Sequence, residues 1–279
     1  MRQHGNTQVV EKIDGVWDRV RLEAEAIAKA EPGLGAFVFS SILAHDCFED
    51  ALIQRLAQRL GNADLGADAV VKAFQDALDA DPDIGHAARA DMVATFDRDP
   101  ACHRLVDPLL YFKGYQALQT HRMAHRLWQM GRKDFAYYLQ SRTSMISSLD
   151  IHPNARIGRG IMIDHGHDIV IGETTVIEDN VSMMQGVTLG GTGKEAGDRH
   201  PKIRHGVLIG AGAKVLGNIE IGHCSRIAAC SVVLHDVPAN RTVAGVPAKI
   251  VGYAGCAEPS RSMDHNVEPE AAPVAGNDE

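Results

Sequence analysis

The feature that most constrains the fold of this chain is a six-residue repeat in its second half. From Ile151 onward an aliphatic residue recurs at almost every sixth position, and a glycine or another small residue often follows it, as in IGRGIM and IGAGAK. This period fits neither the roughly 3.6-residue turn of an α-helix nor the alternation of an ordinary strand. It predicts a left-handed parallel β-helix, in which three hexapeptides close one triangular coil. The predicted inward positions are Ile151, Ile157, Ile163, Ile169, Thr175, Val181, Val187, Ile203, Ile209, Val215, Ile221, Ile227 and Val233.

One interruption divides this repeat into two runs. Val187 and Ile203 should be consecutive inward positions, but the chain between them is longer than one hexapeptide by about ten residues. The segment TLGGTGKEAGDRHPK is rich in glycine and charge, and we expect it to leave the coil as a loop over residues 188–202. Loops that project from a rigid scaffold often carry binding residues, so this loop is a candidate site.

The first half shows the spacing of amphipathic helices. Apolar residues recur three and four positions apart from about Asp14 to Ser147, which places them on one side of each helix. Gly61 and Gly131 are expected to end two of these helices, the second of which would be one long helix from about Pro108. The predicted fold class is α+β, with an α-helical domain over 1–147 that is a scaffold or an interface, a β-helix over 148–252 and a flexible tail over 253–279.

Composition and charge exclude several classes of partner. A net charge of −8 is not typical of a protein that binds nucleic acid or an anionic membrane. No run approaches the roughly 18 apolar residues of a membrane span, and the first residues lack the apolar core of a signal peptide. The five cysteines are an odd number without paired spacing, which is typical of reduced thiols. We therefore expect a cytoplasmic protein.

A cluster of polar residues lies at the start of the repeat. Its members are Asp150, His152, Asp164, His165 and His167. A positioned histidine is the usual general base for a hydroxyl nucleophile, and a nearby carboxylate can orient it. Asp150 and His165 are separated by slightly less than one coil of three hexapeptides, so they can approach each other on neighbouring coils. The alternative is that these groups only solvate the surface of the coil.

Several stretches of this chain resemble bacterial serine O-acetyltransferases, a family of the hexapeptide-repeat acyltransferase superfamily. The main ones are DIHPNARIGRGIMIDHGHDIVIGET from Asp150, VTLGGTGKEAGDRHPKIRHGVLIGAGAKVLGNIEIG from Val187, and AGVPAKIVG from Ala244. The similarity also includes RDPA and PLLYFKGYQALQTHRMAHRLW, and it covers most of residues 90–252. Many β-helix acyltransferases share the closing motif, whereas the combination of DIHP, the Asp-His pair and GGTGK…DRHPKI is specific.

The resemblance implies transfer of an acetyl group from acetyl-coenzyme A to the hydroxyl of L-serine, which is the first step of cysteine biosynthesis. By position, His165 matches the catalytic base of the family and Asp150 matches the residue that orients this base. The positions that match serine-binding residues are Asp99, Asp164, Arg199 and His200. Those that match the coenzyme groove are Gly191, Thr192, Ala211 and Ala229, and Lys249 is expected to meet a phosphate. No metal is expected.

The residue types suit these ligands. The ammonium group of serine calls for carboxylates, and its carboxylate is well bound by the fork of a guanidinium. Ala211 and Ala229 are one full coil apart, so they predict a column of small residues against which a pantetheine arm can lie. One departure is Gly166-His167-Asp168, which adds titratable groups beside the expected base where many members have small, neutral residues.

The resemblance also implies an assembly and partners. Prisms of this kind pack as trimers with the site between subunits, and their helical halves join two trimers, so we expect a homotrimer or hexamer. Free cysteine, which differs from serine by sulfur for oxygen, is expected to inhibit from the serine site. Many members dock a C-terminal isoleucine into cysteine synthase, the next enzyme. The sequence ends in Glu279, so this partnership is left open.

Two other functions are left open by the residues alone. A zinc carbonic anhydrase can be built on such a coil with three histidines, and His200 and His205 have a suitable interval, with His165 or His167 as a third ligand. Against this function, the GGTGK and AGVPAK motifs favour a coenzyme. The second alternative is an acyltransferase for another acceptor, such as a sugar, although the charged residues of the expected serine site favour an amino acid.

Overall fold

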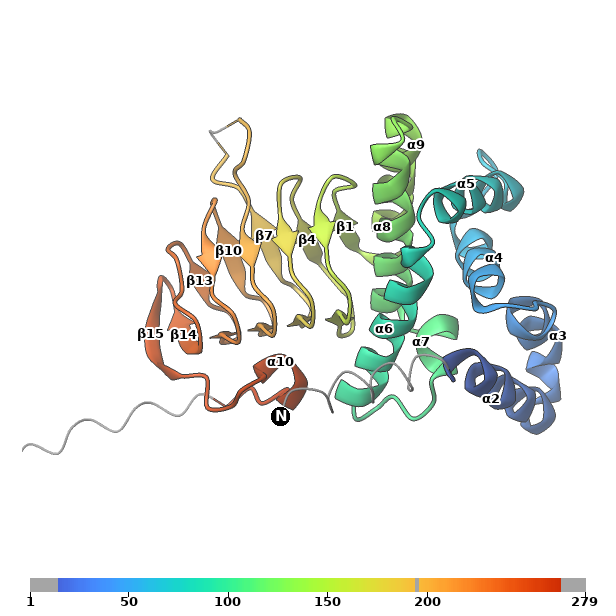
Figure 1. The fold of residues 1–279 in the computed structure, drawn as a ribbon, viewed down its shortest axis with the longest axis horizontal. Coiled ribbons are helices and arrows are strands. Elements are labelled where there is room, and N and C mark those ends of the chain that lie inside the picture. Colours follow the sequence, from blue (N-terminus) through green and yellow to red (C-terminus); the bar gives the residue numbers. More distant parts are fainter. Residues whose placement is uncertain (1–14, 194–195, 267–279) are drawn as a thin grey trace, which may run out of the picture.

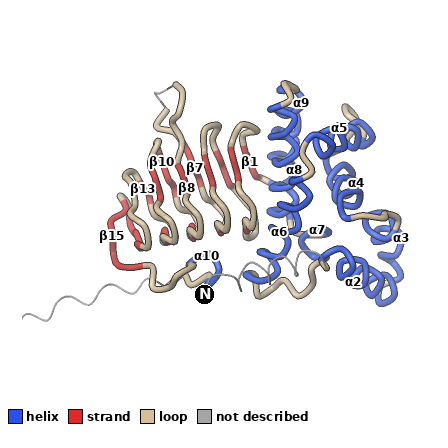
Figure 2. The backbone as a smooth tube through the Cα atoms, in the orientation of Figure 1, coloured by secondary structure: helices blue, strands red, loops and turns tan. Residues whose placement is uncertain are grey.

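The structure is a computed structural model that describes residues 15–193 and 196–266 (Figure 1). Its first part is helical and its second part is a coil of short parallel strands, so the predicted fold class is confirmed (Figure 2). The helices and helical turns are α2 (Val16–Ala30), η1 (Pro32–Leu34), α3 (Gly35–Val38), η2 (Phe39–Leu43), α4 (Phe48–Leu60), α5 (Ala67–Ala80), α6 (Asp83–Arg98), α7 (Val106–Leu110), α8 (Lys113–Gln129), α9 (Lys133–Ser147) and α10 (Pro259–Ser262).

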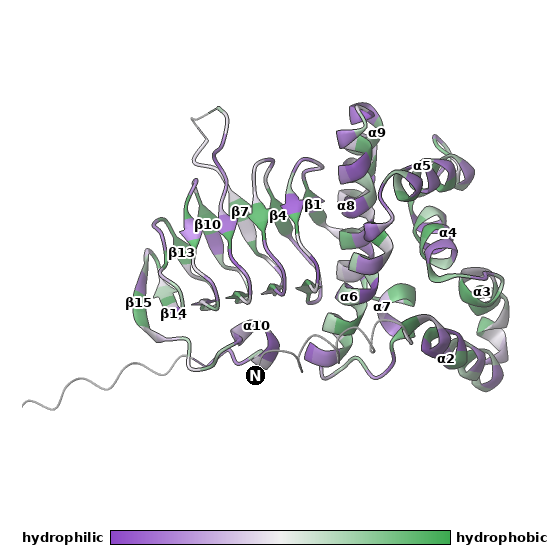
Figure 3. Cartoon of the chain, viewed as in Figure 1, coloured by the Kyte–Doolittle hydropathy of each residue, from purple (hydrophilic) through white to green (hydrophobic). Residues whose placement is uncertain are grey.

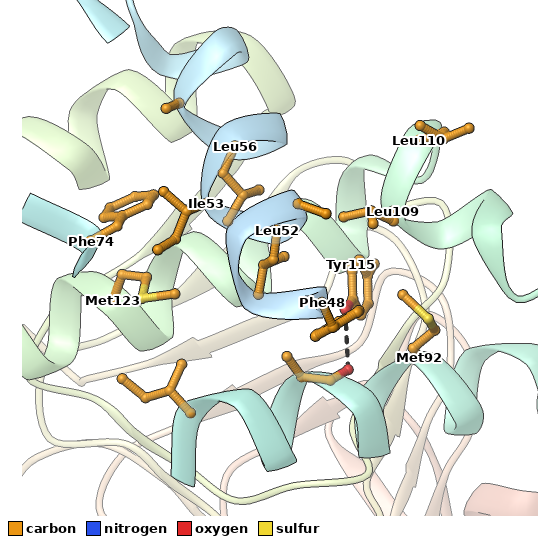
Figure 4. Packing of buried hydrophobic residues seen from close by; sticks show 14 of the residues in the cluster. Phe48, Leu52, Ile53, Leu56, Phe74, Met92, Leu109, Leu110, Tyr115 and Met123 are labelled. Atoms are coloured by element: carbon orange, nitrogen blue, oxygen red, sulfur yellow. Dashed lines mark hydrogen bonds between the residues drawn. The ribbon is translucent and has the colours of Figure 1, made fainter. Parts of the chain in front are cut away.

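The helical region folds around one apolar core. Its helices carry hydrophobic residues on one side and polar residues on the other, as Figure 3 shows by colour. Phe48, Leu52 and Leu56 of α4 and Phe74 of α5 are almost completely buried, and Figure 4 shows them packed together with side chains of α6, α7 and α8. Complete burial of each such side chain contributes about 1.5–3 kcal/mol, so packing rather than helix propensity stabilises this region.

The helix ends follow the sequence signals at two places and depart from them at a third. Gly61 caps α4, and Gly131 follows α8 with a φ of +83°, a conformation that favours glycine. The single long helix expected before Gly131 is instead two helices, because the chain leaves helical geometry at Tyr111-Phe112. Arg55 of α4 stabilises this break by donating a 2.7 Å hydrogen bond to the carbonyl of Leu110.

The strands stack in three flat sheets, with every third strand from β1 to β13 in the same sheet. All pairings are parallel except the one between the last two strands. Face 1 holds β1 (Leu149–Ile151), β4 (Ile169–Ile171), β7 (Thr188–Gly190), β10 (Lys214–Leu216) and β13 (Val232–Val233). Face 2 holds β2 (Arg156–Ile157), β5 (Val176–Ile177), β8 (Lys202–Ile203) and β11 (Glu220–Ile221). Face 3 holds β3 (Met162–Ile163), β6 (Ser182–Met183), β9 (Leu208–Ile209), β12 (Arg226–Ile227), β14 (Arg241–Gly245) and β15 (Ala248–Tyr253).

The stacking register differs by two residues from the predicted one over part of the coil. Ile203 pairs with Ile221, which is one coil of three hexapeptides along the chain, whereas Ile163 of β3 pairs with Met183 of β6, two residues beyond that interval. The two extra residues lie between β3 and β4, in the segment 164–168. As a result, the predicted positions between this segment and the long loop are all buried, but only Ile169 lies in a strand, and Thr175, Val181 and Val187 lie in turns. The strand positions there are Ile171, Ile177, Met183 and Leu189.

The same shift explains two details of the sequence. Thr175, the one predicted inward residue that is not aliphatic, occupies a second, smaller inward position rather than a strand. Val176 of β5 pairs with Lys202 of β8, so the long loop makes this coil about eight residues longer than three hexapeptides, instead of the ten expected. Because residues 188–190 form β7, the loop is confined to 191–201, and its described parts, 191–193 and 196–201, project from the coil in Figure 1.

Helices α8 and α9 join the two regions. Met123 of α8 belongs to the core of the helical region, whereas Leu118 of the same helix belongs to the core of the coil. Asp91 of α6 is fully buried and accepts a 2.7 Å hydrogen bond from Arg122 of α8, which also donates to the carbonyl of Ile157. Breaking such a buried pair typically costs about 3–5 kcal/mol, so this contact holds the coil firmly against the helices.

The chain beyond β15 returns along face 3. There α10 packs against α6 and β9. Ser182 of β6 donates a 2.7 Å hydrogen bond to the carbonyl of Ser260, and Arg226 of β12 donates one of 2.8 Å to the carbonyl of Asp264. Part of the predicted flexible tail, residues 253–266, is therefore packed on the coil, and the remainder, residues 267–279, lies outside the described residues.

The part of the chain that the structure describes has neither a membrane-spanning helix nor a disulfide bond. None of its helices combines the length and the apolar character that crossing a membrane requires. Its cysteines, which are Cys47, Cys102, Cys224, Cys230 and Cys256, are all free thiols. The spacing of these residues in the sequence had predicted reduced thiols, and no disulfide closes any loop of the described fold.

Candidate active site

The turns between face 3 and face 1 form one edge of the coil, which we call the His165 edge. It consists of residues 164–168, 184–187, 210–213 and 228–231. His165, Ala211 and Ala229 all lie on these turns, so the expected base and the expected coenzyme column share one edge. Backbone hydrogen bonds of 2.7 or 2.8 Å stack the successive turns, from Gly186 to His167, from Gly212 to Gln185 and from Cys230 to Ala211.

His165 lies in the turn that the two extra residues create. His165, Gly166 and Asp168 all have positive φ values, a conformation that is uncommon for residues other than glycine. Gly166 packs against Gly114 of α8 and Leu149 of β1, and a Cβ at Gly166 would come too close to the backbone of Gly114. The turn therefore directs the His165 side chain away from the coil, where it is 72% exposed.

Asp150, the expected partner of His165, follows Leu149 in the chain, and Leu149 is the residue of β1 that packs against Gly166. It is the middle residue of β1, and its side chain points out of face 1 because Leu149 and Ile151 are buried. Within the described ranges no hydrogen bond or ion pair joins Asp150 to His165, and Gln140 of α9 donates a 2.6 Å hydrogen bond to Oδ1 of Asp150. The structure thus brings the two predicted catalytic residues to one region of the coil without a direct contact between them.

The other polar residues of the turn pair among themselves. Oδ2 of Asp164 lies 3.9 Å from Nε2 of His165. His167 turns toward Lys113 of α8, with Nδ1 3.3 Å from Nζ, and toward Asp168, with Nε2 3.3 Å from Oδ2. The titratable groups that depart from the family pattern therefore interact with each other and with α8 rather than with the expected base.

The turns between face 1 and face 2 form a second edge, which we call the Arg199 edge. Its described residues are 152–155, 172–175, 191–193, 196–201 and 217–219. The hydroxyl oxygen of Thr174 accepts hydrogen bonds from the backbone N–H groups of Arg199 at 3.0 Å and of His200 at 3.1 Å. Glu173 accepts a 2.8 Å hydrogen bond from Nη2 of Arg199, which lowers the pKa of the Glu173 carboxyl. Residues 173–174 thus fasten the end of the long loop to the coil.

His200 is held tightly on this edge. Its side chain is buried, and its ring packs on Gly172, where a Cβ would overlap the imidazole. The N–H of Thr174 donates to Nδ1 of His200 at 3.2 Å, so the ring proton belongs on Nε2. Burial lowers the pKa of His200, and the nearby charge of Arg199 lowers it further. His200 is therefore a neutral imidazole at pH 7 whose Nε2 is a donor.

The residues expected to bind the coenzyme divide between the two edges. Ala211 and Ala229 lie on adjacent turns of the His165 edge. Gly191 and Thr192 begin the long loop of the Arg199 edge. Lys249 is exposed on β15, at the far end of the coil. Since face 1 separates the two edges, a single chain does not bring all of these residues together.

Asp99, expected to bind serine, belongs to the helical region and not to a turn of the coil. It ends α6, and its Oδ1 accepts a 2.8 Å hydrogen bond from the backbone N–H of Ala101. The preceding Arg98 reaches face 3, where Nη1 donates a 3.0 Å hydrogen bond to the hydroxyl of Ser182. In the part of the chain described here, no hydrogen bond or ion pair joins Asp99 to Asp164, Arg199 or His200.

Three residues that contact the expected site were not identified from the sequence. Glu173 and Thr174 precede Arg199 and His200 by one coil of three hexapeptides plus the residues that the long loop inserts. The length of the insertion would have identified them once the register was known. Gln140 has no such signal, because its contact with Asp150 depends on the angle between α9 and the coil.

The histidines considered above as zinc ligands lie on different edges. His205 follows β8 on the edge between faces 2 and 3, where its ring stacks on that of His223 at 5.3 Å. Nε2 of His205 lies 3.8 Å from the Sγ of Cys224. Within residues 15–193 and 196–266, no group of three or more His, Cys, Asp or Glu side chains is arranged to hold a metal ion. His200 and His205 therefore do not converge within one chain.

Two family models and a curated relative match the chain. The model described as "Serine acetyltransferase, N-terminal" matches residues 16–120, and the model described as "Bacterial transferase hexapeptide (six repeats)" matches residues 200–235. A serine acetyltransferase of Salmonella typhimurium is 50% identical over 256 residues, which are 92% of this chain and 94% of that protein. The resemblance inferred from the motifs is therefore confirmed.

Solved structures match both regions of the chain. A serine acetyltransferase from Brucella abortus in complex with coenzyme A is 56% identical, with a TM-score of 0.86 over 88% of this chain and 99% of that one. A serine acetyltransferase in complex with cysteine is 48% identical, with a TM-score of 0.89 over 91% of this chain and 99% of that one. These chains share both the helical region and the coil.

Proposed function

Because this chain belongs to the serine acetyltransferase family, we propose that its active site is formed by the His165 edge of one subunit and the Arg199 edge of the next. The chain is an acyltransferase that moves the acetyl group of acetyl-coenzyme A to the hydroxyl of L-serine, the first step of cysteine biosynthesis. The observation that supports the assignment of residues is the line of His165, Ala211 and Ala229 on one edge of the coil.

The acetyl group moves directly in a ternary complex, without an acyl-enzyme. No serine or cysteine of the described residues is hydrogen-bonded to His165, so none has the usual contact of an activated nucleophile. His165 takes the proton of the serine hydroxyl while that oxygen attacks the thioester carbonyl. Backbone N–H groups of the groove stabilise the oxyanion, a contribution of about 3 kcal/mol. The C–S bond then breaks, and the coenzyme thiolate leaves with the proton that His165 holds.

Charge complementarity supports the assignment of the serine-binding residues. Asp164 and Asp99 supply carboxylates for the ammonium group. Arg199 supplies a guanidinium for the substrate carboxylate, and Glu173 already orients its Nη2. His200 donates a further hydrogen bond from Nε2. Serine thus binds with its hydroxyl toward the base of the neighbouring His165 edge.

The coenzyme lies along the groove between the two edges. Ala211 and Ala229 offer only methyl groups, so the pantetheine arm can approach the backbone of the coil closely. Gly191 and Thr192 of the adjoining edge close the groove, and Lys249 on β15 meets a phosphate. The complex of the Brucella abortus relative with coenzyme A supports this ligand.

A trimer is the assembly that completes the site. Face 1 separates the two edges in one chain. The residues expected to bind one serine and one coenzyme molecule therefore come together only when two subunits are adjacent. Three coils with face 1 toward a common axis bring each His165 edge to an Arg199 edge. The helical region then joins two trimers through exposed apolar side chains such as Leu22 and Phe39, which are 67% and 59% exposed.

Cysteine acts as the inhibitor of this enzyme. It shares the ammonium and carboxylate groups of serine and therefore competes for the same residues, and the complex of a relative with cysteine supports this assignment. A partnership with cysteine synthase stays a prediction, because residues 267–279, where the family makes this contact, lie outside the described range. A cytoplasmic location likewise stays a prediction from the sequence.

A thiol-release assay tests the activity and the choice of acceptor. The purified protein is mixed with acetyl-coenzyme A and with L-serine, L-threonine, L-homoserine or a sugar, and the free thiol of coenzyme A is measured. We expect rapid release with L-serine and release near the hydrolysis background with the sugar. Faster release with the sugar or with homoserine than with serine would assign the chain to another acceptor.

A further inference from the structure

One side chain of the helical region reaches Asp150, which we propose orients the base His165. Nε2 of Gln140, on α9, donates a 2.6 Å hydrogen bond to Oδ1 of Asp150, on β1. Both side chains are half-buried. Oδ2 of Asp150 accepts no hydrogen bond from any residue in the described ranges. A hydrogen bond to an ionised carboxylate is among the stronger ones in proteins, so this contact sets the orientation of the Asp150 carboxylate.

The backbone on both sides of this contact is rigid. α9 ends at Ser147 and β1 begins at Leu149, so only Ser148, with a φ of +61°, separates the helix from the coil. The hydroxyl of Ser147 donates a 2.6 Å hydrogen bond to the carbonyl of Thr143, which secures the last turn of α9. Leu139 of α9 and Leu149 of β1 are fully buried. The helix therefore has little freedom to pivot, and the side of α9 that carries Gln140 stays over Asp150.

An amide is chemically suited to orient this carboxylate. The NH₂ group of Gln140 is a donor that does not ionise, so it does not compete for the proton that His165 moves. By occupying Oδ1, Gln140 leaves Oδ2 as the acceptor for an imidazole N–H. We propose that Gln140 is a positioning residue that acts through Asp150, an inference that rests on the proposed function. The helical region then contributes to the chemistry as well as to the assembly.

A double-mutant cycle on the full-length enzyme tests this inference. Gln140→Met keeps the length of the side chain and removes the donor, and we expect it to lower kcat about tenfold with little change in the KM of either substrate. Since Gln140 acts only through Asp150, the same change in an Asp150→Ala background should lower kcat less than twofold. Gln140→Glu, which places a like charge at Oδ1, should lower kcat further than Gln140→Met.

Tyr138→Phe is the matched control on the same helix. It removes a 3.0 Å hydrogen bond between the Tyr138 hydroxyl and the amide of Asn62 inside the helical region, and we expect it to leave kcat unchanged. Thermal melting and size-exclusion chromatography of every variant report on folding and assembly. Should Gln140→Met fail to assemble, the isosteric Gln140→Glu takes its place in the cycle, and its larger loss of kcat should likewise shrink when residue 150 is alanine.

The possible outcomes separate the two proposals. An equal loss of kcat in both backgrounds, or a rise in KM with kcat unchanged, would mean that Gln140 acts on folding or binding, and this overturns the inference. If Asp150→Ala lowers kcat and Gln140→Met does not, only the role of Gln140 is wrong. If Asp150→Ala itself keeps full turnover, Asp150 does not orient the base, and the proposed function of that residue fails together with the inference.

Discussion

The two edges of face 1 are built in opposite ways. On the His165 edge, the expected base is 72% exposed and its side chain makes no hydrogen bond within the described chain. On the Arg199 edge, His200 is only 7% exposed, and Thr174 and Glu173 hold both His200 and Arg199. The difference follows from the insertions, because the short insertion after β3 makes an open turn and the longer one after β7 makes a loop that folds back onto the coil.

This difference in exposure agrees with the function proposed for each edge. Groups that recognise the fixed charges of an amino acid bind it more tightly when they are held in place beforehand. A general base must exchange its proton with the substrate and with the leaving group, so it needs access to both. Arg199 and His200, proposed to bind the substrate carboxylate, are therefore held in place within one chain, and the base is left open toward the neighbouring subunit.

The largest effect is expected at the open edge. His165→Ala should lower kcat by about 10²–10⁴, the range typical of a lost general base, while coenzyme binding persists. Asp150→Asn should cost less, because it removes only orientation and charge. Steady-state thiol release gives kcat, and equilibrium binding gives the coenzyme affinity. Near-full turnover of His165→Ala would mean that another residue is the base. The proposed difference in function between the His165 edge and the Arg199 edge would then be wrong.

A smaller effect is expected where the Arg199 edge meets the substrate carboxylate. Arg199→Ala removes charge-assisted hydrogen bonds of about 1.5–3 kcal/mol, so the KM of serine should rise about 10–100-fold. Cysteine inhibition should weaken in parallel, and the KM of acetyl-coenzyme A should change little. Arg204→Ala is the control, because Arg204 pairs with Glu178 on another edge. Intact cysteine inhibition beside lost serine binding would show that cysteine binds elsewhere.

A comparison of two histidines sharpens the distinction between edges. His200→Ala removes a buried ring from the Arg199 edge, and we expect kcat/KM for serine to fall about tenfold. His205→Ala, on the edge between faces 2 and 3, should be nearly silent. Because the proposed chemistry needs only a neutral imidazole, exhaustive chelation should leave turnover unchanged. Equal damage at both histidines, together with loss of activity on chelation, would support the zinc alternative instead.

The smallest effect is expected on stability. Burial lowers the pKa of His200, so the unfolded chain binds this proton more readily than the folded chain. The free energy of unfolding should therefore be highest above about pH 6.5 and fall as the pH drops below it, by at most about 1.4 kcal/mol per pH unit for one residue. Burial also lowers the pKa of His121, His125 and His152, so the variant must be compared with the wild type.

Urea unfolding of the wild type and of His200→Gln at a fixed protein concentration, from about pH 7 to about pH 5.5, gives this difference. The variant should show a shallower dependence of the unfolding free energy on pH, by up to one proton. Identical slopes for the two proteins would mean that the Arg199 edge does not keep His200 neutral. The two edges would then not differ in the way that their burial indicates.

In the coil, the periodic sequence pattern predicted the repeat but not the complete register of the strands. The repeat was predictable because each hexapeptide forms its own side of the coil and needs only its neighbours in sequence. The register after Ile163 was not predictable from the pattern. Each hexapeptide has two inward positions that are two residues apart, and both are mostly aliphatic, so a shift of two residues leaves the repeat looking unchanged. Thr175 was the one residue in the predicted series that departed from the aliphatic pattern, and it marks the shifted segment.

The sequence by itself determined the three-sided coil, the helix ends at Gly61 and Gly131, and, through its resemblance to a known family, the candidate site residues. These properties depend on contacts within one helical turn or one coil. Only the tertiary structure decided which of those residues share an edge, and that Gln140 contacts Asp150 and Thr174 contacts His200. Such contacts depend on the length of an insertion and on the angle at which α9 meets the coil, and packing of the whole chain sets that angle.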